Sequence, residues 1–228
     1  MKKNYLVIGC LLFCCSSYAQ KLSQVTFSNG SVFSWFSILT NQNILIRISD
    51  DGKILEYGTE EHSYYNNNYF APKLIHWAGS VNYYDQSTDS AYRGKIKNIG
   101  SCFFTYYPSY DNPQKAGKIK SAGSLSFDYY EKFQDALFAG KIKNIGTNTI
   151  NYYSSIDNDA VKGKLKMIGT TLIAYYSSFD DALIKGKVKS IGSARYIWYT
   201  SSDRREYQGA IKSGYQRQLI NGITFILW

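Results

Sequence analysis

A seven-residue motif that returns every 23 residues constrains the fold of this chain more than any other feature. It reads Gly-Lys-Ile-Lys-x-Ile-Gly with conservative changes, and an aromatic pair follows it at a fixed distance. Copies of the motif begin at Gly94, Gly117, Gly140, Gly163 and Gly186, and a decayed copy begins at Gly209. The aromatic pairs are Tyr106-Tyr107, Tyr129-Tyr130, Tyr152-Tyr153, Tyr175-Tyr176 and Trp198-Tyr199. Self-similarity at such a period predicts an array of small repeated units.

The composition of the unit is typical of β-strands. It is rich in Ile, Tyr, Phe and Thr and is punctuated by glycine, and two strands of about eight residues with two short turns would fill it. Between Ala160 and Tyr176 successive residues fall alternately on the two faces of each strand, as half-buried strands require. Gly169 suits a tight hairpin with a positive φ, and a Ser-x-x-Asp turn closes the other end. Asn29-Gly30 and Asn221-Gly222 are further hairpin signals.

These signals predict an all-β fold, an antiparallel meander of tandem 23-residue β-hairpin repeats. The repeats would cover residues 52–214 within a single domain over residues 20–228, beginning with two shortened units. Because one strand face is apolar, the sheet must curl on itself, fold over into a sandwich or close into a barrel. We also expect an aromatic ring, such as that of Tyr152 or Tyr175, to lie across the glycine that opens each repeat.

A parallel β-helix is the alternative, because one of its coils has a similar length. In such a solenoid, equivalent residues stack about 4.8 Å apart. Lys95, Lys118 and their successors would then form a ladder of like charges, which is destabilising. In a hairpin array another strand separates the copies and places tyrosines beside the lysines, where ammonium groups can lie near aromatic faces. The charge pattern therefore favours hairpins.

The repeat resembles the bacterial variants of the MORN family over about residues 52–214. The Gly-Lys-Ile-Lys-x-Ile-Gly run followed by Tyr-Tyr carries the resemblance. The Gly-x-Gly of typical MORN units is missing, and Ser-x-x-Asp turns replace their Asn-Gly turns. The resemblance implies an extended or curved sheet of hairpins that serves attachment and display rather than catalysis.

The first 19 residues have the pattern of a signal peptide. Two lysines precede a short apolar run, and Ser17-Tyr18-Ala19 has small residues at the two positions that a signal peptidase reads. Cleavage is therefore predicted between Ala19 and Gln20, and lipidation at Cys10 is the less favoured alternative. We expect an exported protein of the periplasm, the cell surface or the extracellular medium.

Removal of the signal peptide changes both cysteine content and charge. Only Cys102 remains of four cysteines, so no intramolecular disulfide can form, and we expect this residue to pack as a small apolar side chain. The 26 basic residues fall to 24 against 17 acidic ones, a net charge of +7. In an exported protein this excess makes nucleic acid an unexpected partner and favours an anionic polysaccharide or another cell-envelope component. Membrane association and oligomeric state stay open.

The sequence offers few candidate catalytic residues. The two histidines, His62 and His76, have no Cys or Asp neighbours at metal-ligand spacing. Asp157-Asn158-Asp159 is the best calcium candidate, but the other repeats do not keep its pattern, and turn capping explains these residues better. Distinctive residues are duplicated in every unit, whereas an enzyme site is a unique constellation. The sequence therefore predicts a protein that is not an enzyme and has no cofactor and no metal site.

The candidate binding face consists of the motif lysines and the second tyrosine of each pair. Its residues are Lys95, Lys97, Lys118, Lys120, Lys141, Lys143, Lys164, Lys166, Lys187, Lys189, Tyr107, Tyr130, Tyr153, Tyr176 and Tyr199. Aromatic rings flanked by cations suit stacking on sugars that carry anionic groups. Alternatively, the tyrosines merely cover lysine stems on a solvated face.

The sequence thus predicts a structural, adhesive or surface-binding protein, with anionic glycans as the candidate ligand. A small outer-membrane β-barrel is the alternative function. The signal peptide and the aromatic-ended last segment, residues 223–228, favour it. Short turns at both ends of every unit and a thin apolar stripe argue against it.

Overall fold

The computed structural model describes residues 20–61 and 73–228, so the predicted signal peptide, His62 and the Tyr64-Tyr65 pair lie outside the described residues. The described residues form strands and turns without a helix, which confirms the all-β prediction. None of them belongs to a helix that is long and apolar enough to cross a bilayer. The strands are β1 Lys21–Ser28, β2 Val32–Leu39, β3 Leu45–Ile48, β4 Ile54–Glu60, β5 Leu74–His76, β6 Val81–Tyr83, β7 Ile96–Ile99, β8 Cys102–Tyr106, β9 Ile119–Ala122, β10 Leu125–Tyr129, β11 Ile142–Ile145, β12 Asn148–Tyr152, β13 Leu165–Ile168, β14 Thr171–Tyr175, β15 Val188–Ile191, β16 Ala194–Arg195, β17 Ile197–Trp198, β18 Ile211–Ser213, β19 Arg217–Ile220 and β20 Ile223–Leu227.

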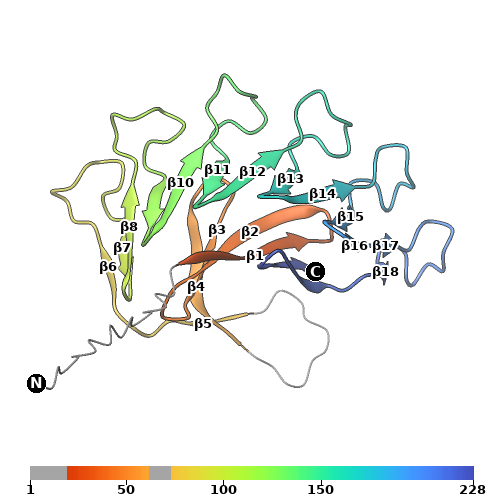
Figure 1. Cartoon of the computed structure of the whole chain (residues 1–228), viewed down its shortest axis with the longest axis horizontal. Helices are drawn as coiled ribbons and strands as arrows, with labels where there is room; N and C mark the ends of the chain where they lie inside the picture. The colour runs from red at the N-terminus through yellow and green to blue at the C-terminus, as the bar shows by residue number, and fades with distance from the viewer. Residues whose placement is uncertain (1–19, 62–72) are drawn as a thin grey trace, which may run out of the picture.

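The repeats form a meander of eleven strands in the order β16 to β6, and the short β17–β18 hairpin follows it. Each strand pairs antiparallel with the next one in the sequence, so the hairpin prediction is confirmed and equivalent strands are never neighbours. In Figure 1 the hairpins follow one another in an open arc. The described strands do not close into a barrel.

The eleven-stranded sheet begins at β6 and not near residue 52, where the first shortened unit was predicted to begin. The segments expected to form the first two shortened units, β4 and β5, belong to a separate seven-stranded sheet of order β19-β20-β1-β2-β3-β4-β5. The reason is strand pairing, because β4 pairs along its length with β3, where Leu45 faces Gly58. The last strand, β20, lies between β19 and β1 and pairs parallel with β1.

The two sheets share one hydrophobic core, which hides the apolar face of the repeats. Val25, Phe36 and Ile46 of the seven-stranded sheet are fully buried in the same cluster as Phe104 and Ile173 of the repeats. The tips of two hairpins also join the ladder of the repeat sheet. The amide of Val188 donates to the carbonyl of Gly30, and the amide of Ile142 donates to that of Asp50, both at 2.7 Å. Strands β1 to β3 therefore lie within the arc (Figure 1).

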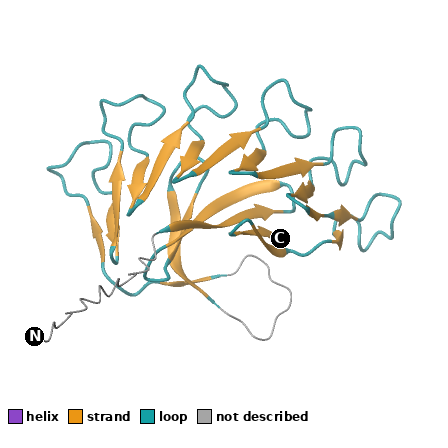
Figure 2. Cartoon of the chain, viewed as in Figure 1, coloured by secondary structure: helices purple, strands orange, loops and turns teal. Residues whose placement is uncertain are grey.

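The two connections of each repeat differ in length, which overturns the prediction that both are short. The inner one is a two-residue turn with glycine first, as at Gly169, whose φ of 55° confirms the predicted positive value. The outer one is a long loop, such as residues 176–187, and these loops line the outer rim in Figure 2. The strands have only four or five residues in most repeats, because the loops take up the rest of the period.

Candidate functional site

The two lysines of each motif contact different tyrosines, so the predicted face is divided into two columns. The second lysine lies in a β-bulge. At Lys120, for example, Thr105 and Tyr106 pair with Ser121 and Ile119, and Lys120 is the extra residue. A bulge bends the strand and turns its side chains away from simple alternation. The two tyrosines of a pair contact different lysines, as Tyr106 does with Lys95 and Tyr107 with Lys120, and the ring of Tyr107 also packs edge-on against Tyr129, the first tyrosine of the next pair.

The inner lysine column is formed by the first lysine of each motif and lies toward the seven-stranded sheet. Its members are Lys95, Lys118, Lys141, Lys164 and Lys187, and their ammonium groups lie 4.3–5.3 Å from the ring centres of Tyr106, Tyr129, Tyr152, Tyr175 and Trp198. Four of them donate to the carbonyl of the glycine that opens the next repeat, as Lys118 does to Gly140. Burial lowers the pKa of Lys95, Lys118 and Lys187, and lowers that of Lys164 to about 8. These lysines are therefore half-buried and largely committed to the protein itself.

The outer lysine column is formed by the second lysine of each motif, four of which are exposed while Lys143 and Lys166 are half-buried. Its members are Lys97, Lys120, Lys143, Lys166, Lys189 and Lys212, and they lie 5.0–5.8 Å from the ring centres of Tyr84, Tyr107, Tyr130, Tyr153, Tyr176 and Tyr199. The tyrosines are held in place, because the hydroxyl of Tyr153 donates to the carbonyl of Ile173 and four others make the equivalent bond. The predicted association of this tyrosine set with lysines is thus formed in the outer column alone.

The glycine that opens each repeat does not lie under an aromatic ring, which corrects that prediction. Gly140 and Gly186 lie beneath the ammonium groups of Lys118 and Lys164 instead. Their φ values of 80° and 74° show that these positions need glycine for a left-handed turn conformation. Aromatic rings cover glycines of the hairpin tips: Trp198 lies over Gly30 and Tyr129 over Gly52.

The long loops are joined to one another by side chains that sequence reasoning assigned only to turn capping. Asp180 accepts hydrogen bonds from the amide and hydroxyl of Ser177, which confirms the predicted capped turn. The next residue, Asp181, caps the amide of Leu183 and also accepts from the amide of Ser201, twenty residues ahead in the following loop. Asp89, Asp135 and Asn158 make the same link between other loops. The loops therefore hold one another in a regular row.

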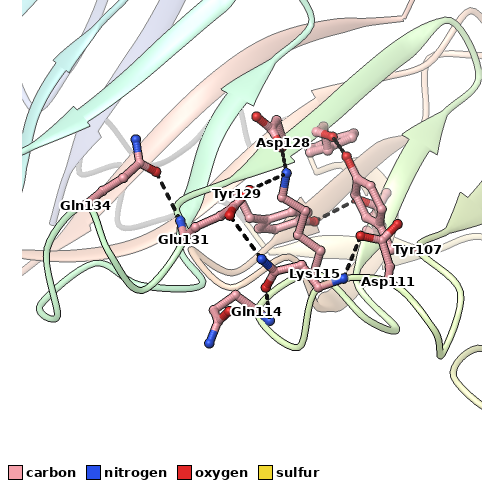
Figure 3. A network of polar contacts seen from close by, with 11 residues as sticks. Tyr107, Asp111, Gln114, Lys115, Asp128, Tyr129, Glu131 and Gln134 are labelled. Carbon is pink, nitrogen blue, oxygen red and sulfur yellow. Dashed lines mark hydrogen bonds and ion pairs between the residues drawn. The ribbon is translucent and has the colours of Figure 1, made fainter.

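One loop departs from the pattern in a way that the structure explains. Lys115 stands where other repeats place an apolar residue, such as Phe138, and its side chain is mostly buried. It forms ion pairs with Asp128 at 2.8 Å and Glu131 at 3.3 Å, and it lies near the ring of Tyr107 (Figure 3). Burial opposes ionisation of Asp128, but the hydrogen bonds from Lys115 and the amide of Tyr129, together with the positive charges of Lys115 and Lys143, outweigh it, so the pKa of Asp128 is below its usual value. Two carboxylates thus compensate a lysine placed in an apolar position.

A row of exposed apolar side chains also follows the 23-residue period and was missed at the sequence level. Tyr110, Phe133, Ile156 and Phe179 occupy the same position in successive loops and are 83–93% exposed. Their spacing was visible in the sequence, but a period alone does not say which positions face solvent. Large apolar side chains with this exposure contribute almost nothing to the core.

Two cavities lie between the hairpin tips of the seven-stranded sheet and the inner lysine column. One, of about 340 Å³, is lined by Gly52, Lys53, Tyr83, Lys95 and Tyr106, among others. The second, of about 270 Å³, includes Phe33, Asp50, Lys141, Tyr152 and Lys164 in its lining. Within residues 20–61 and 73–228, no group of three or more His, Cys, Asp or Glu side chains is placed to hold a metal ion. Cys102 is fully buried on β8, as predicted, and burial raises its pKa to about 11.

Comparison of the chain with protein-family models, with curated proteins and with solved structures gives no match.

Proposed function

We propose that this chain is an exported, non-enzymatic scaffold that binds anionic polysaccharide of the cell envelope through the outer lysine column. The observation that carries the proposal is a row of ammonium groups at the same position in each repeat, on exposed or half-buried lysines, each held over a tyrosine ring. Equivalent lysines are two strands apart, roughly 9–10 Å. Such a row matches a polymer that carries charge at regular intervals better than it matches a small molecule.

The electrostatics of the column support an anionic ligand. Among the described residues, Lys97, Lys120, Lys143, Lys166 and Lys189 have no carboxylate within ion-pairing distance, and only Lys212 pairs with an acid, Asp203. Asp128 and Asp157 lie near enough to Lys143 and Lys166 for their pKa values to be lowered, but they form no ion pair with them. The column therefore keeps unpaired positive charge for a partner.

The tyrosines of the column support the lysines. Each ring has an ammonium group near its face, and each hydroxyl except that of Tyr199 donates to a backbone carbonyl of the next repeat. A lysine ordered in this way loses less conformational entropy on binding than a free one. Tyr130 is buried in the core, so stacking of sugar rings is a prediction for the other tyrosines of the column. Export and cleavage before Gln20 also stay predictions. The side chain of Gln20 already belongs to the folded domain, since it accepts hydrogen bonds from the amide and hydroxyl of Ser124.

The test compares two triple variants with equal loss of charge. The first replaces Lys120, Lys143 and Lys166 by Gln, and the second replaces the exposed Lys21, Lys132 and Lys185 by Gln. The mature protein should be retained on immobilised polygalacturonate at low salt and released as salt rises. The outer-column variant should elute at much lower salt, and the matched variant should elute nearly as the wild type does.

Equal elution of both variants would mean that net charge, and not the column, determines binding. Absence of retention of the wild type on any anionic polysaccharide would refute the proposed ligand. Thermal unfolding of both variants should stay close to that of the wild type, because none of the six replaced lysines is buried.

A further inference from the structure

The inner lysine column shows which chemical groups fit beside it. At Lys141 the partner is a carboxylate, Asp50, whose Oδ2 lies 3.0 Å from Nζ. At Lys187 it is the carbonyl oxygen of Asn29, also at 3.0 Å. Both oxygens come from hairpin tips of the seven-stranded sheet. The hairpin tips therefore supply a carboxylate or a carbonyl oxygen to some lysines of the inner column.

Lys164 occupies the equivalent position but has no ion pair with a hairpin tip, and a cavity separates it from the β1–β2 hairpin. Its ammonium group donates to the carbonyl of Gly186 and lies 5.1 Å from the ring centre of Tyr175. No carboxylate among the described residues forms an ion pair with it. An ammonium group has three donor hydrogens, so the bond to Gly186 leaves donors for the cavity of about 270 Å³ beside it. Burial without a counter-charge is unfavourable, which is why the pKa of Lys164 is lowered to about 8 while the group remains mostly charged at neutral pH.

A second polar group, on a residue that lines the same cavity, lacks a partner. The hydroxyl of Tyr152 is buried and makes no hydrogen bond within the described residues, although the side chain is only 6% exposed. The equivalent hydroxyls of Tyr106, Tyr129 and Tyr175 each donate to a backbone carbonyl. A buried hydroxyl without a partner is unfavourable, so an acceptor that entered the cavity would stabilise it.

The remaining lining includes two lysines that already have carboxylate partners, Lys141 with Asp50 and Lys162 with Asp159, and a set of uncharged groups. Ser31 and Ser34 supply hydroxyl groups, Phe33 and Leu165 supply apolar surface, and Gly163 leaves the backbone accessible. This mixture suits a compact molecule with a carboxylate, several hydroxyls and one apolar face. The volume is close to the lower limit for ligand sites, roughly 300 Å³.

We propose that the cavity between the β1–β2 hairpin and Lys164 binds a single uronate sugar or a similar small hydroxylated carboxylate. Its carboxylate would accept from the ammonium group of Lys164, in the place that Asp50 takes at Lys141, and one of its oxygens would accept from the hydroxyl of Tyr152. The cavity lies on the inner side, separate from the outer lysine column. Its ligand is therefore independent of the polysaccharide proposed above.

The experiment is isothermal titration calorimetry of the mature protein with D-galacturonate, D-galactose and polygalacturonate. Galacturonate should bind at least about tenfold more tightly than galactose, because a hydrogen bond between charged groups is the stronger kind. Lys164→Met should weaken galacturonate binding at least about tenfold. Tyr152→Phe should weaken it about three- to tenfold, since it removes only a hydroxyl.

Lys95→Met is the matched control. Lys95 belongs to the same column, is also half-buried and faces the other cavity, where the hydroxyl of Tyr106 is already bonded to the carbonyl of Ile96. This variant should bind galacturonate within about twofold of the wild type. Lys95 does not line the proposed binding cavity, and substitutions at distant sites act independently. Tyr152→Phe decides the outcome even if Lys164→Met does not fold, because the lost hydroxyl has no partner in the protein.

Four results would overturn the proposal. They are equal affinity for galacturonate and galactose, binding of polygalacturonate without binding of the monomer, an unchanged affinity of Tyr152→Phe, and equal losses in Lys95→Met and Lys164→Met. Loss of polymer retention in the outer-column variant with unchanged galacturonate binding would show that the two sites are separate.

Discussion

Replacing Gly30 by Ala should destabilise the protein more than the same change at Gly222. Both glycines follow an asparagine in a hairpin turn, and both have a left-handed conformation, with φ of 62° and 80°. They differ in their surroundings. A β-carbon on Gly30 would come within 3 Å of three ring atoms of Trp198, whereas one on Gly222 would have nothing within 4 Å.

The expected loss of stability is the sum of backbone strain at a left-handed residue and packing strain against Trp198. A left-handed conformation costs an L residue roughly 1–2 kcal/mol, and both variants lose this amount. Forcing an extra carbon into a packed site adds about 1–3 kcal/mol, and only Gly30→Ala has this term. Trp198 cannot move without strain, because its indole N–H donates to the carbonyl of Val188 at 2.7 Å and its side chain is buried. We therefore expect Gly30→Ala to lose about 2 kcal/mol more than Gly222→Ala.

Equilibrium unfolding in urea, followed by far-UV circular dichroism, measures the difference. The slope of the free energy against urea should be unchanged, since the surface exposed on unfolding is the same. In thermal unfolding the extra loss corresponds to a melting temperature about 4–8 °C lower for Gly30→Ala. Equal losses in the two variants would show that docking of the β1–β2 tip under Trp198 contributes nothing to stability.

Three further predictions concern the loops and the lysines. Ile156→Ser together with Phe179→Ser should shift the melting temperature by no more than about 2 °C, because both side chains are 93% exposed; a larger fall would show that the tips pack in solution. The Lys115→Ile variant should be less stable than the wild type, and adding Asp128→Ala should restore much of the lost stability. A double-mutant cycle measured by urea unfolding should give a coupling free energy of about 0.5–2 kcal/mol. Additive effects of the two substitutions would contradict a partly buried ion pair between these residues. The folded pKa of Lys164, about 8, is below its unfolded value of 10.5, so the unfolded state binds more protons between these pH values and the stability of the wild type should rise relative to Lys164→Met. The gain between pH 7.5 and 9.5 should be about 1 kcal/mol once solvent screening of a half-buried group is allowed for, and a constant difference between the two proteins would contradict it.

Much of the local structure follows from the sequence itself. The 23-residue period, the glycine turns and the alternation around Gly169 are sufficient to predict antiparallel hairpins, because each depends on residues close together in the chain. The like-charge argument against a stacked coil is also correct, since another strand separates Lys141 from Lys164. Capping by Asp180 is equally local, because it joins residues three positions apart.

Loop length and lysine position depend on details that alternation does not contain. A bulge at Lys120 adds a residue to one strand only, and no local residue preference distinguishes it from a regular strand. The left-handed glycines that open the repeats also make the strands begin later than a two-residue period suggests, since β13 begins at Leu165, two residues after Gly163. For these reasons the predicted single face of lysines and tyrosines is divided in the structure.

The placement of the seven-stranded sheet was decided by tertiary structure alone. The contacts that fix it join residues far apart in the sequence, such as Asn29 with Lys187 and Gln20 with Ser124. The sequence marks Lys141 and Lys164 as equivalent, yet a hairpin tip supplies a carboxylate to the first and leaves a cavity beside the second. The repeat gives equivalent side chains in each unit. Their neighbours, however, come from the seven-stranded sheet, which has no such repeat. How that sheet packs against the repeats therefore decides which lysines have a partner.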